Sequence, residues 1–284
     1  MKTILVPTDY SAAAKNAALY AINLASQVRV QNIILYNAYQ APPVLTETAV
    51  MPTTSLPYFD IETFHDISKK GMEQFKESIE NLCPGDIKID TQIEYGGLDN
   101  HVNELCKNNG ADLIVMGITG TSKIEELLMG STAVNVVKNT NVPVIIVPAG
   151  AKYNSIKNVM LACDYKKVAE TTPLQPIKSI LDATKAALHV VNVYESDKEI
   201  TSNKTYQQEL LHSLLKNYEP RFHFENNEDF ITGINDFVEA NNIDLIITIP
   251  KKHSFFEGLF KESHTKKLAF HSHVPLMYIH EEEL

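Results

Sequence analysis

The sequence starts without a long hydrophobic segment. The apolar stretch after Met1 is soon interrupted by Pro7 and Asp9. It is therefore far too short for the core of a signal peptide or for a membrane-spanning helix. We expect a protein that stays in the cytoplasm and has no membrane partner.

Cysteine is also scarce. The chain has three cysteines, Cys83, Cys106 and Cys163, which lie far apart and show no paired spacing. This distribution argues against a disulfide framework and against a zinc knuckle. We therefore expect three reduced thiols.

Histidines gather near the end of the chain, but not in a metal-binding pattern. Four of them fall within a short stretch, namely His253, His264, His271 and His273. Imidazole is a common metal ligand, yet this spacing corresponds neither to HExxH nor to a Cys-His zinc pattern. We predict no metal site.

Basic residues are too few for a typical nucleic-acid-binding protein. Lys and Arg number 25, whereas Asp and Glu number 35, which gives a formal net charge of −10. Affinity for nucleic acid comes largely from Lys and Arg that neutralise backbone phosphates. The charge balance argues against a nucleic acid as the main partner.

The pattern of apolar residues predicts an α/β protein. With 284 residues, the chain is about twice as long as a usual domain. In its first half, short apolar runs alternate with longer segments of helical period, which is typical of a parallel sheet covered by crossover helices. The expected strands are 3–7, 32–38, 87–95, 112–116 and 144–147. The expected helices are 11–27, 61–82, 98–109 and 131–139.

The second half repeats this plan. Its expected strands are 156–162, 187–194, 222–225, 245–249 and 276–279. Three stretches align in order: 6–10 with 161–165, 111–115 with 243–247, and 141–144 with 273–276. Ordered matches of this kind indicate an internal repeat. We predict two domains, residues 1–150 and 151–284.

One segment of the first half has the features of a phosphate-binding site. The strand that ends at Met116 is followed by Gly117 and Gly120, and Gly130 and Ser131 then open a helix. In open α/β sheets, ligands bind at the carboxyl ends of strands. Glycine permits positive φ angles and close backbone approach, and the start of a helix offers free N–H groups and a positive dipole end to an anion. The segment therefore suits a polyphosphate.

The full spacing Gly-x2-Gly-x9-Gly-Ser after a strand, together with Pro7-Thr8-Asp9-Tyr10-Ser11 at the end of the first strand, resembles the universal stress protein family, specifically its ATP-binding branch. The resemblance implies two tandem Rossmann-like domains, each an open, mostly parallel five-stranded sheet with helices on both faces. It also implies binding of ATP, pairing of domains through their last strands, and a role as a stress-response regulator. We expect Mg²⁺ to enter with the triphosphate, and we expect a homodimer.

The resemblance assigns phosphate and ribose contacts by position. Gly117, Gly120, Gly130 and Ser131 would hold the phosphates and ribose, and Thr132 would add a backbone contact.

The same resemblance assigns the base pocket. Asp9 would lie at the adenine end, and Thr8 belongs to the same binding segment. Ala38 matches the position whose main chain recognises adenine, while Met116 and Pro7 would form part of the pocket wall. We predict no catalytic residue.

The second half lacks the glycine motif. Its alignment sets Pro250-Lys251-Lys252-His253 against the segment 117–120 and, after a one-residue deletion, Glu262-Ser263 against 130–131. Proline donates no N–H, and a carboxylate repels a phosphate. We expect this half to bind no ATP and to serve as the fixed pairing partner of the first, with Asp164 serving the turn that contains it.

Two other functions remain open. Slow ATP hydrolysis could use Asp9 and Ser131, although the chain has no Walker lysine and no recognisable general base. An interaction or scaffold protein without a nucleotide could use the Pro-rich residues 40–58 or the aromatic segment after Pro250.

Overall fold

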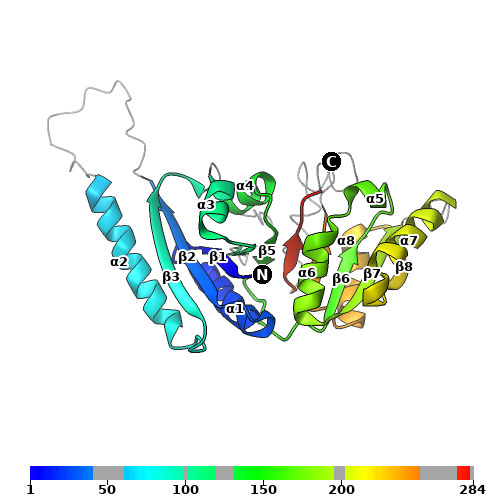
Figure 1. Ribbon diagram of the computed structural model, residues 1–284, viewed down its shortest axis with the longest axis horizontal. Helices are drawn as coiled ribbons and strands as arrows, with labels where there is room; N and C mark the ends of the chain where they lie inside the picture. The colour runs from blue at the N-terminus through cyan, green and yellow to red at the C-terminus, as the bar shows by residue number, and fades with distance from the viewer. Residues whose placement is uncertain (41–60, 99–100, 119–130, 195–201, 250–273, 282–284) are drawn as a thin grey trace, which may run out of the picture.

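Ten strands form one open sheet within the residues that the computed structural model describes, which are 1–40, 61–98, 101–118, 131–194, 202–249 and 274–281. The strand order is β3-β2-β1-β4-β5-β10-β9-β6-β7-β8. β5 and β10 pair antiparallel at the centre, and all other neighbours are parallel. Read outward from the centre, both halves have the same strand order (Figure 1).

All ten strands lie where the sequence predicts them, with ends that differ by at most two residues. In the first half they are β1 (Thr3–Pro7), β2 (Asn32–Tyr39), β3 (Lys88–Tyr95), β4 (Leu113–Gly117) and β5 (Val144–Val147). In the second half they are β6 (Asn158–Ala162), β7 (Ala187–Tyr194), β8 (Arg221–Asn226), β9 (Leu245–Thr248) and β10 (Leu276–Tyr278).

Helices connect the strands. Those of the first half are α1 (Ala12–Val28), α2 (Ile61–Glu80), α3 (Val102–Asn109) and α4 (Ser131–Asn139). Those of the second half are α5 (Val168–Thr171), α6 (Leu174–Thr184), α7 (Ser202–Leu215) with the 3₁₀ turn η3 (Lys216–Tyr218), and α8 (Phe230–Ala240). One long helix follows β1, whereas two short helices follow the equivalent strand β6.

The sheet separates two hydrophobic cores. Helices α1, α2, α5, α6 and α7 pack on one face, and α3, α4 and α8 pack on the other. Each core contains residues of both halves of the chain. The two halves therefore share continuous apolar layers across the β5–β10 junction.

The segment between the halves is bound to α1. Asn16 Nδ2 donates to the carbonyls of Pro148 (3.1 Å) and Ala151 (3.0 Å). Further along α1, the amide of Gln27 exchanges two hydrogen bonds with the main chain of Ile156, at 2.9 and 2.8 Å. These contacts satisfy backbone groups of the linker and fix its path.

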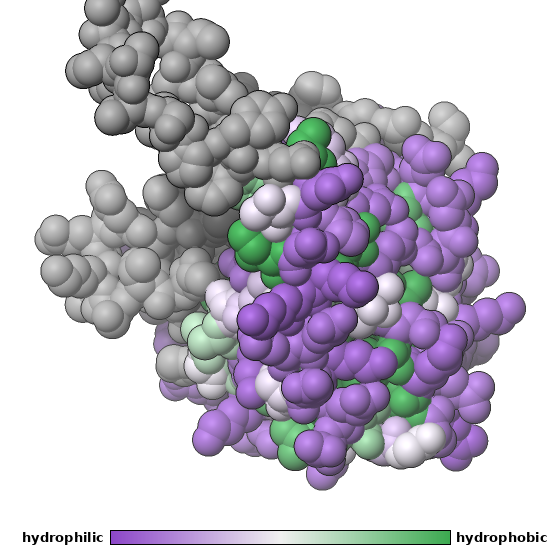
Figure 2. Space-filling model, turned by 90° about the vertical axis from the view of Figure 1, so that its left-hand side faces the viewer, coloured by the Kyte–Doolittle hydropathy of each residue, from purple (hydrophilic) through white to green (hydrophobic). Residues whose placement is uncertain are grey.

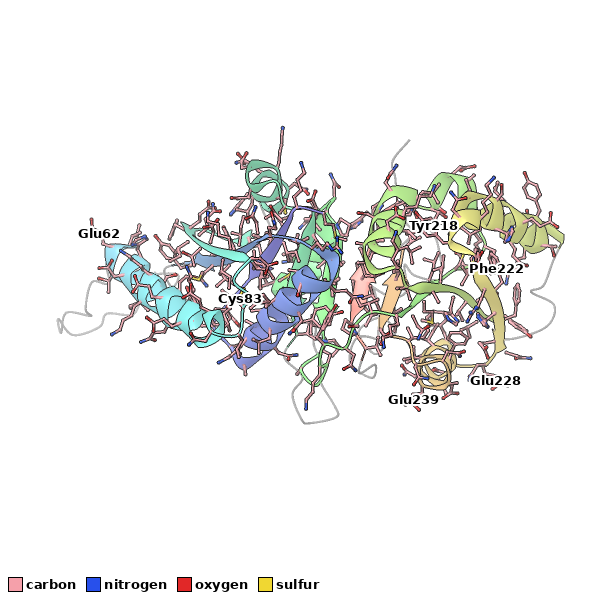
Figure 3. All side chains as sticks on the ribbon, turned by 60° about the horizontal axis from the view of Figure 1, so that its bottom comes forward. Glu62, Cys83, Tyr218, Phe222, Glu228 and Glu239 are labelled. Carbon is pink, nitrogen blue, oxygen red and sulfur yellow. The ribbon has the colours of Figure 1, made fainter. Side chains whose placement is uncertain are left out.

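The outer edges of the sheet are β3 and β8. Figure 2 shows the end formed by α2 and β3, where hydrophilic side chains predominate and apolar ones are scattered. Lys88 and Asp90 of β3 form an ion pair at 2.8 Å, and such charges disfavour pairing of an edge strand with another chain. At the opposite end, Figure 3 shows Phe222 on β8, Glu228 shortly before α8, and Glu239 near the end of α8.

Candidate functional site

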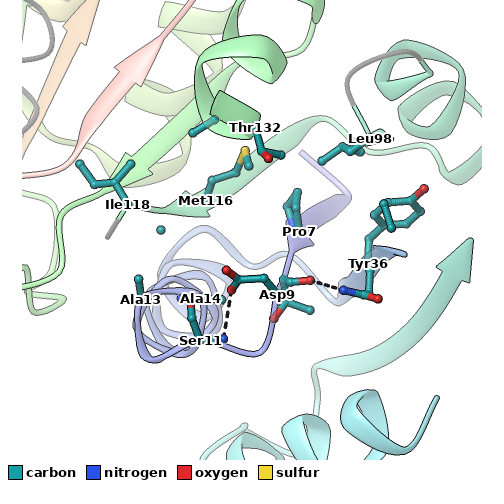
Figure 4. A pocket seen from close by; sticks show the side chains of 15 residues that line it. Pro7, Asp9, Ser11, Ala13, Ala14, Tyr36, Leu98, Met116, Ile118 and Thr132 are labelled. Carbon is teal, nitrogen blue, oxygen red and sulfur yellow. Dashed lines mark hydrogen bonds between the residues drawn. The ribbon is translucent and has the colours of Figure 1, made fainter. Parts of the chain in front are cut away.

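A pocket of about 220 Å³ lies at the carboxyl ends of β1, β2 and β4. Open parallel sheets bind ligands where the connections from neighbouring strands leave to opposite faces. Here α1, which follows β1, lies on one face, and α4, which follows β4, lies on the other. The pocket is lined by Pro7, Thr8, Asp9, Ser11, Ala13, Ala14, Tyr36, Asn37, Ala38, Leu98, Met116, Gly117, Ile118, Thr132 and Ala133 (Figure 4).

Hydrogen bonds fix the turn between β1 and α1. Thr8 N donates to the carbonyl of Tyr36 (2.8 Å), and Asn37 Nδ2 donates to the carbonyl of Thr8 (2.7 Å). Thr8 Oγ1 accepts from the N–H of Tyr10 (2.9 Å), whose φ of 66° lies in the left-handed region. The buried Asn37 also accepts from Ser68 Oγ on α2. Asn37 therefore joins β1, β2 and α2 beneath the pocket.

Asp9 and Ser11 organise the start of α1. The exposed Asp9 accepts at Oδ1 from the N–H of Ser11 (3.0 Å), which forms an Asx turn (Figure 4). Ser11 is the N-cap of α1, and its Oγ accepts from the N–H of Ala14 (3.2 Å). The amino-terminal end of α1, with the positive end of its dipole, is thereby held at the pocket.

Gly117 allows α1 to approach the end of β4. A Cβ atom at this position would lie 2.2 Å from the carbonyl oxygen of Ala13 and 3.2 Å from the nitrogen of Ala14. Gly117 is not among the described residues with positive φ. Of the two properties that glycine offers, this position therefore uses close backbone approach, which it makes to the start of α1.

Tyr36 and Leu98 close the pocket at its apolar end. Tyr36 is 1% exposed and Leu98 is 4% exposed. The Tyr36 hydroxyl donates to Glu94 Oε2 (3.0 Å) and lies 2.8 Å from His101 Nε2. Burial, followed by the hydrogen bond and the negative charge of Glu94, raises the pKa of Tyr36 well above its usual value. Tyr36 therefore remains a neutral hydrogen-bonding phenol at physiological pH.

Most of the residues that the sequence assigned to a nucleotide lie together in this pocket. Seven of them line it: Pro7, Thr8, Asp9, Ala38, Met116, Gly117 and Thr132. Ser131 is the first residue of α4, and nothing of its side chain is described. Gly120 and Gly130 lie outside the described residues, as do the four histidines of the segment 253–273.

Other lining residues were missed by the sequence analysis. Tyr36 precedes Ala38 by two positions on the same strand, so the alternation of a strand places both on one face and is a usable signal. Asn37 is a polar residue at the end of an apolar strand, which is a weaker signal. Leu98 comes from the connection after β3, and no local pattern assigns it to the pocket.

The second half contains the same turn after β6. Asn192 Nδ2 donates to the carbonyl of Cys163 (2.8 Å), and Cys163 Sγ accepts from the N–H of Tyr165 (3.4 Å). Tyr165 has a φ of 53°, and Asp164 Oδ1 accepts from the N–H of Lys166 (3.0 Å). These bonds match those after β1 one for one. The turn role predicted for Asp164 is confirmed.

Strand registers align the two halves without a deletion. Leu113 of β4 pairs with Ile4 of β1, and Leu245 of β9 pairs with Val159 of β6. Ile4 and Val159 occupy the same position relative to the matching turns, so Leu113 corresponds to Leu245. The sequence alignment after β9 was therefore wrong by one residue.

In the corrected alignment of the two halves, the residue equivalent to Gly117 is Ile249 and not Pro250. Ile249 is buried in the core on the face where α1 packs in the first half. A side chain at this position excludes the approach that Gly117 permits. In agreement, α5 has four residues, no side-chain N-cap bond, and a break at Pro173 before α6 begins.

The described parts form a Rossmann-like α/β protein with one pocket at the switch point of its first half. The model of the universal stress protein family matches residues 1–148, so the chain belongs to this family.

Known proteins support this assignment. Universal stress protein MJ0531 of Methanocaldococcus jannaschii is 31% identical over 146 residues, which are 51% of this chain and 81% of the relative. Universal stress protein MJ0577 of the same organism is 26% identical over 153 residues, covering 51% and 94%. The crystal structure of a universal stress protein from Archaeoglobus fulgidus has a TM-score of 0.73 at 21% identity and covers 98% of both chains. The fold similarity therefore extends over both halves.

Among the described residues, no helix is both long enough and apolar enough to cross a membrane.

Proposed function

We propose that this chain binds ATP in the pocket of its first half and acts as a nucleotide-responsive regulator in the stress response. The observation that carries the proposal is the convergence of seven assigned residues, from four separate parts of the sequence, on one pocket. The pocket lies at the end of the sheet where α/β proteins of this type bind nucleotides.

The lining favours one orientation of the nucleotide. Pro7, Met116, Tyr36 and Leu98 form an apolar end that suits a flat base, next to the main chain of Ala38. The first residues of α4 form the other end, where free N–H groups and the helix dipole stabilise a phosphate. Residues Gly117, Gly120, Gly130 and Ser131 remain the proposed phosphate and ribose contacts.

Magnesium enters this proposal with the nucleotide. Triphosphates bind Mg²⁺ through their own oxygens, and proteins commonly add few ligands to it. The described lining contains one carboxylate, Asp9, which already accepts a hydrogen bond from the main chain. We assign no protein ligand to the metal.

The second half is proposed to be the fixed pairing partner of the first. β10 pairs with β5, and His280 contacts the carbonyl of Val137 in the last turns of α4. The site equivalent to Gly117 is filled by Ile249. We therefore infer that the second half binds no ATP in this manner and supports the helix that holds the phosphates.

Calorimetric titration of ATP with Mg²⁺ tests the proposal. The wild-type chain should bind one ATP. Gly130→Glu copies the residue that the second half has in the aligned position, Glu262. The added carboxylate repels the triphosphate, so affinity should fall by about tenfold or more, or about 1.4 kcal/mol.

Gly85→Glu is the matched control. Gly85 is exposed, and a Cβ at this position meets nothing within 4 Å. This variant carries the same change in charge and should bind ATP as the wild type does. Absence of binding to the wild type would refute the proposal, and two sites per chain would refute the silent second half.

A further inference from the structure

Three polar side chains meet behind the apolar end of the pocket. They are Tyr36, Glu94 and His101, here called the Tyr36 triad. The Tyr36 hydroxyl lies 3.0 Å from Glu94 Oε2 and 2.8 Å from His101 Nε2, and the last two atoms are 3.3 Å apart. The rings of Tyr36 and His101 meet edge to face at 6.4 Å. All three side chains therefore contact one another at a single point.

The triad joins both ends of the connection that carries Leu98. Glu94 lies at the end of β3, in register with Ala38, whereas His101 immediately precedes α3. Leu98 lies between them, and its carbonyl accepts from the N–H of His101 (3.3 Å). One hydroxyl on β2 thus holds the residues before and after the Leu98 wall of the pocket.

Further hydrogen bonds fix Glu94 within the triad. Its Oε1 accepts from Gln92 Nε2, and Gln92 Oε1 accepts from Asn109 Nδ2 on α3 at 3.0 Å. Both oxygens of Glu94 therefore have partners, which are Tyr36 of β2, Gln92 of β3 and His101 before α3, and Gln92 in turn binds the end of α3. Such networks rigidify the groups that they connect.

The Tyr36 hydroxyl is bound to Glu94 and His101, so Tyr36 contributes the apolar part of its side chain to the pocket. The lining at this end comprises the Tyr36 ring, Leu98, Met116 and Pro7, all of which are apolar surfaces. A base stacks on such surfaces, whereas a phosphate would lie near the carboxylate of Glu94 and be repelled by it. The chemistry of this wall matches the base of a nucleotide and not its phosphates.

We propose that Tyr36 is a positioning residue for the base. Its hydroxyl, through Glu94 and His101, holds Leu98 in place and thereby sets the affinity for the base and nucleoside part of the ligand. This inference rests on the proposed function, because it concerns the same pocket. It goes further, because it holds that the affinity for the base depends on Tyr36, Glu94 and His101, none of which belongs to the glycine motif or to the segment Pro7–Ser11.

Three probes separate the two ends of the pocket: Mg-ATP, adenosine and inorganic tripolyphosphate. Tyr36→Phe keeps the ring and removes the hydroxyl. Adenosine and ATP should bind about tenfold more weakly, the order expected for loss of a hydrogen bond to a charged group. Tripolyphosphate should bind as it does to the wild type. Tyr39→Phe is the matched control, because Tyr39 lies on the same strand outside the pocket.

A second pair of variants tests the chemistry of the triad. Glu94→Gln keeps an acceptor for the Tyr36 hydroxyl and should stay within about twofold of wild-type affinity for adenosine. Glu94→Ala should match Tyr36→Phe, and the double variant should be no weaker than either single one. Glu94 and His101 are both partly exposed, so these variants leave no deeply buried charge.

Each outcome separates the two proposals. No binding of ATP to the wild type would overturn both. Normal binding to the wild type with equal affinities for Tyr36→Phe and Tyr39→Phe would overturn the positioning role alone. The positioning role would also be overturned if Tyr36→Phe lost as much affinity for tripolyphosphate as for adenosine, because the hydroxyl would then act on the whole pocket. If Tyr36→Phe fails to fold, the contrast between Glu94→Gln and Glu94→Ala decides.

Discussion

At the scale of single residues, two histidines at the outer edge of the sheet share one hydrogen bond. His189 Nδ1 on β7 lies 3.2 Å from His223 Nε2 on β8, and their rings stack at 5.2 Å. Phe237 of α8 meets both rings edge to face. His189 Nε2 is buried and has no hydrogen-bond partner among the described residues. This environment favours neutral rings.

The pair predicts that the protein loses stability in mild acid. Burial is the main cause that lowers the pKa of each histidine. The charges of His223 and Arg221 lower the pKa of His189 further. For His223, Glu225 partly opposes the lowering of the pKa, and Arg221 adds to it. The unfolded chain takes up protons near pH 6.5, before the folded pair does. Stability should be complete above about pH 6.5 and should fall as the pH decreases below it.

Urea unfolding at pH 7.5 and pH 5.5 measures this effect. In His223→Gln, the loss of stability between the two pH values should be smaller than in the wild type. His212→Gln serves as the control, because His212 is exposed and should leave the loss unchanged. An equal loss in all three proteins would contradict the role of the pair.

The candidate site was only partly accessible from single residues in the sequence. Gly117 was recognised through its motif, but its packing against Ala13 depends on the path of α1, which no local pattern contains. Leu98 and Tyr36 meet because β2 and β3 are neighbours. Contacts between distant residues of this kind follow from topology, so they became visible only in the folded chain.

At the scale of elements, the turn after β1 and the turn after β6 use the same asparagine clamp. Asn37 and Asn192 donate to the carbonyls of Thr8 and Cys163, the residues that directly follow β1 and β6. Asn37 accepts in turn from Ser68, whereas Asn192 accepts from Lys204 at 3.4 Å. The two clamps are alike, although only the first lies at a pocket with the assigned residues.

Replacing each asparagine by leucine separates stability from binding. Asn37→Leu and Asn192→Leu should each reduce the free energy of unfolding by about 1–3 kcal/mol, because the carbonyl of Thr8 or of Cys163 loses its side-chain donor. Asn37→Leu should also weaken ATP binding, while Asn192→Leu should leave it unchanged. Chemical denaturation together with calorimetry measures both quantities. Equal effects of the two variants on ATP affinity would contradict a site confined to the first half.

The elements themselves were predictable from the sequence. Strands were identified correctly because buried parallel strands are continuous apolar runs, such as Leu113–Gly117. The start of α3 was predicted too early, at residue 98, whereas the helix begins at Val102. Gly96, with a φ of 130°, lies between the end of β3 and Leu98, and Leu98 lines the pocket instead of opening the helix.

At the scale of the whole molecule, the antiparallel pair β5–β10 makes one sheet of two halves. β5 and β10 each have a neighbour on both sides. The homodimer that we expect from the sequence therefore needs another surface. The domain limits 1–150 and 151–284 remain a prediction, with the linker bound to α1 at the proposed boundary.

A chain shortened to residues 1–150 should expose β5 and form a dimer. In the full chain, all four residues of β5 are buried, so the shortened chain presents an apolar edge strand without its partner. Light scattering after size-exclusion chromatography measures the mass. A stable monomer that binds ATP with the full-length affinity would argue against the pairing role of the second half.

Ile249 makes the divergence of the two halves hard to reverse. A return to glycine would remove a buried side chain and cost about 2–5 kcal/mol, while the broken helix around Pro173 would still be unable to fill the space. Several changes would have to occur together before the second half regained a close helix approach. A reversion by single mutations would therefore pass through less stable intermediates. We expect the asymmetry between the halves to persist among descendants of this chain.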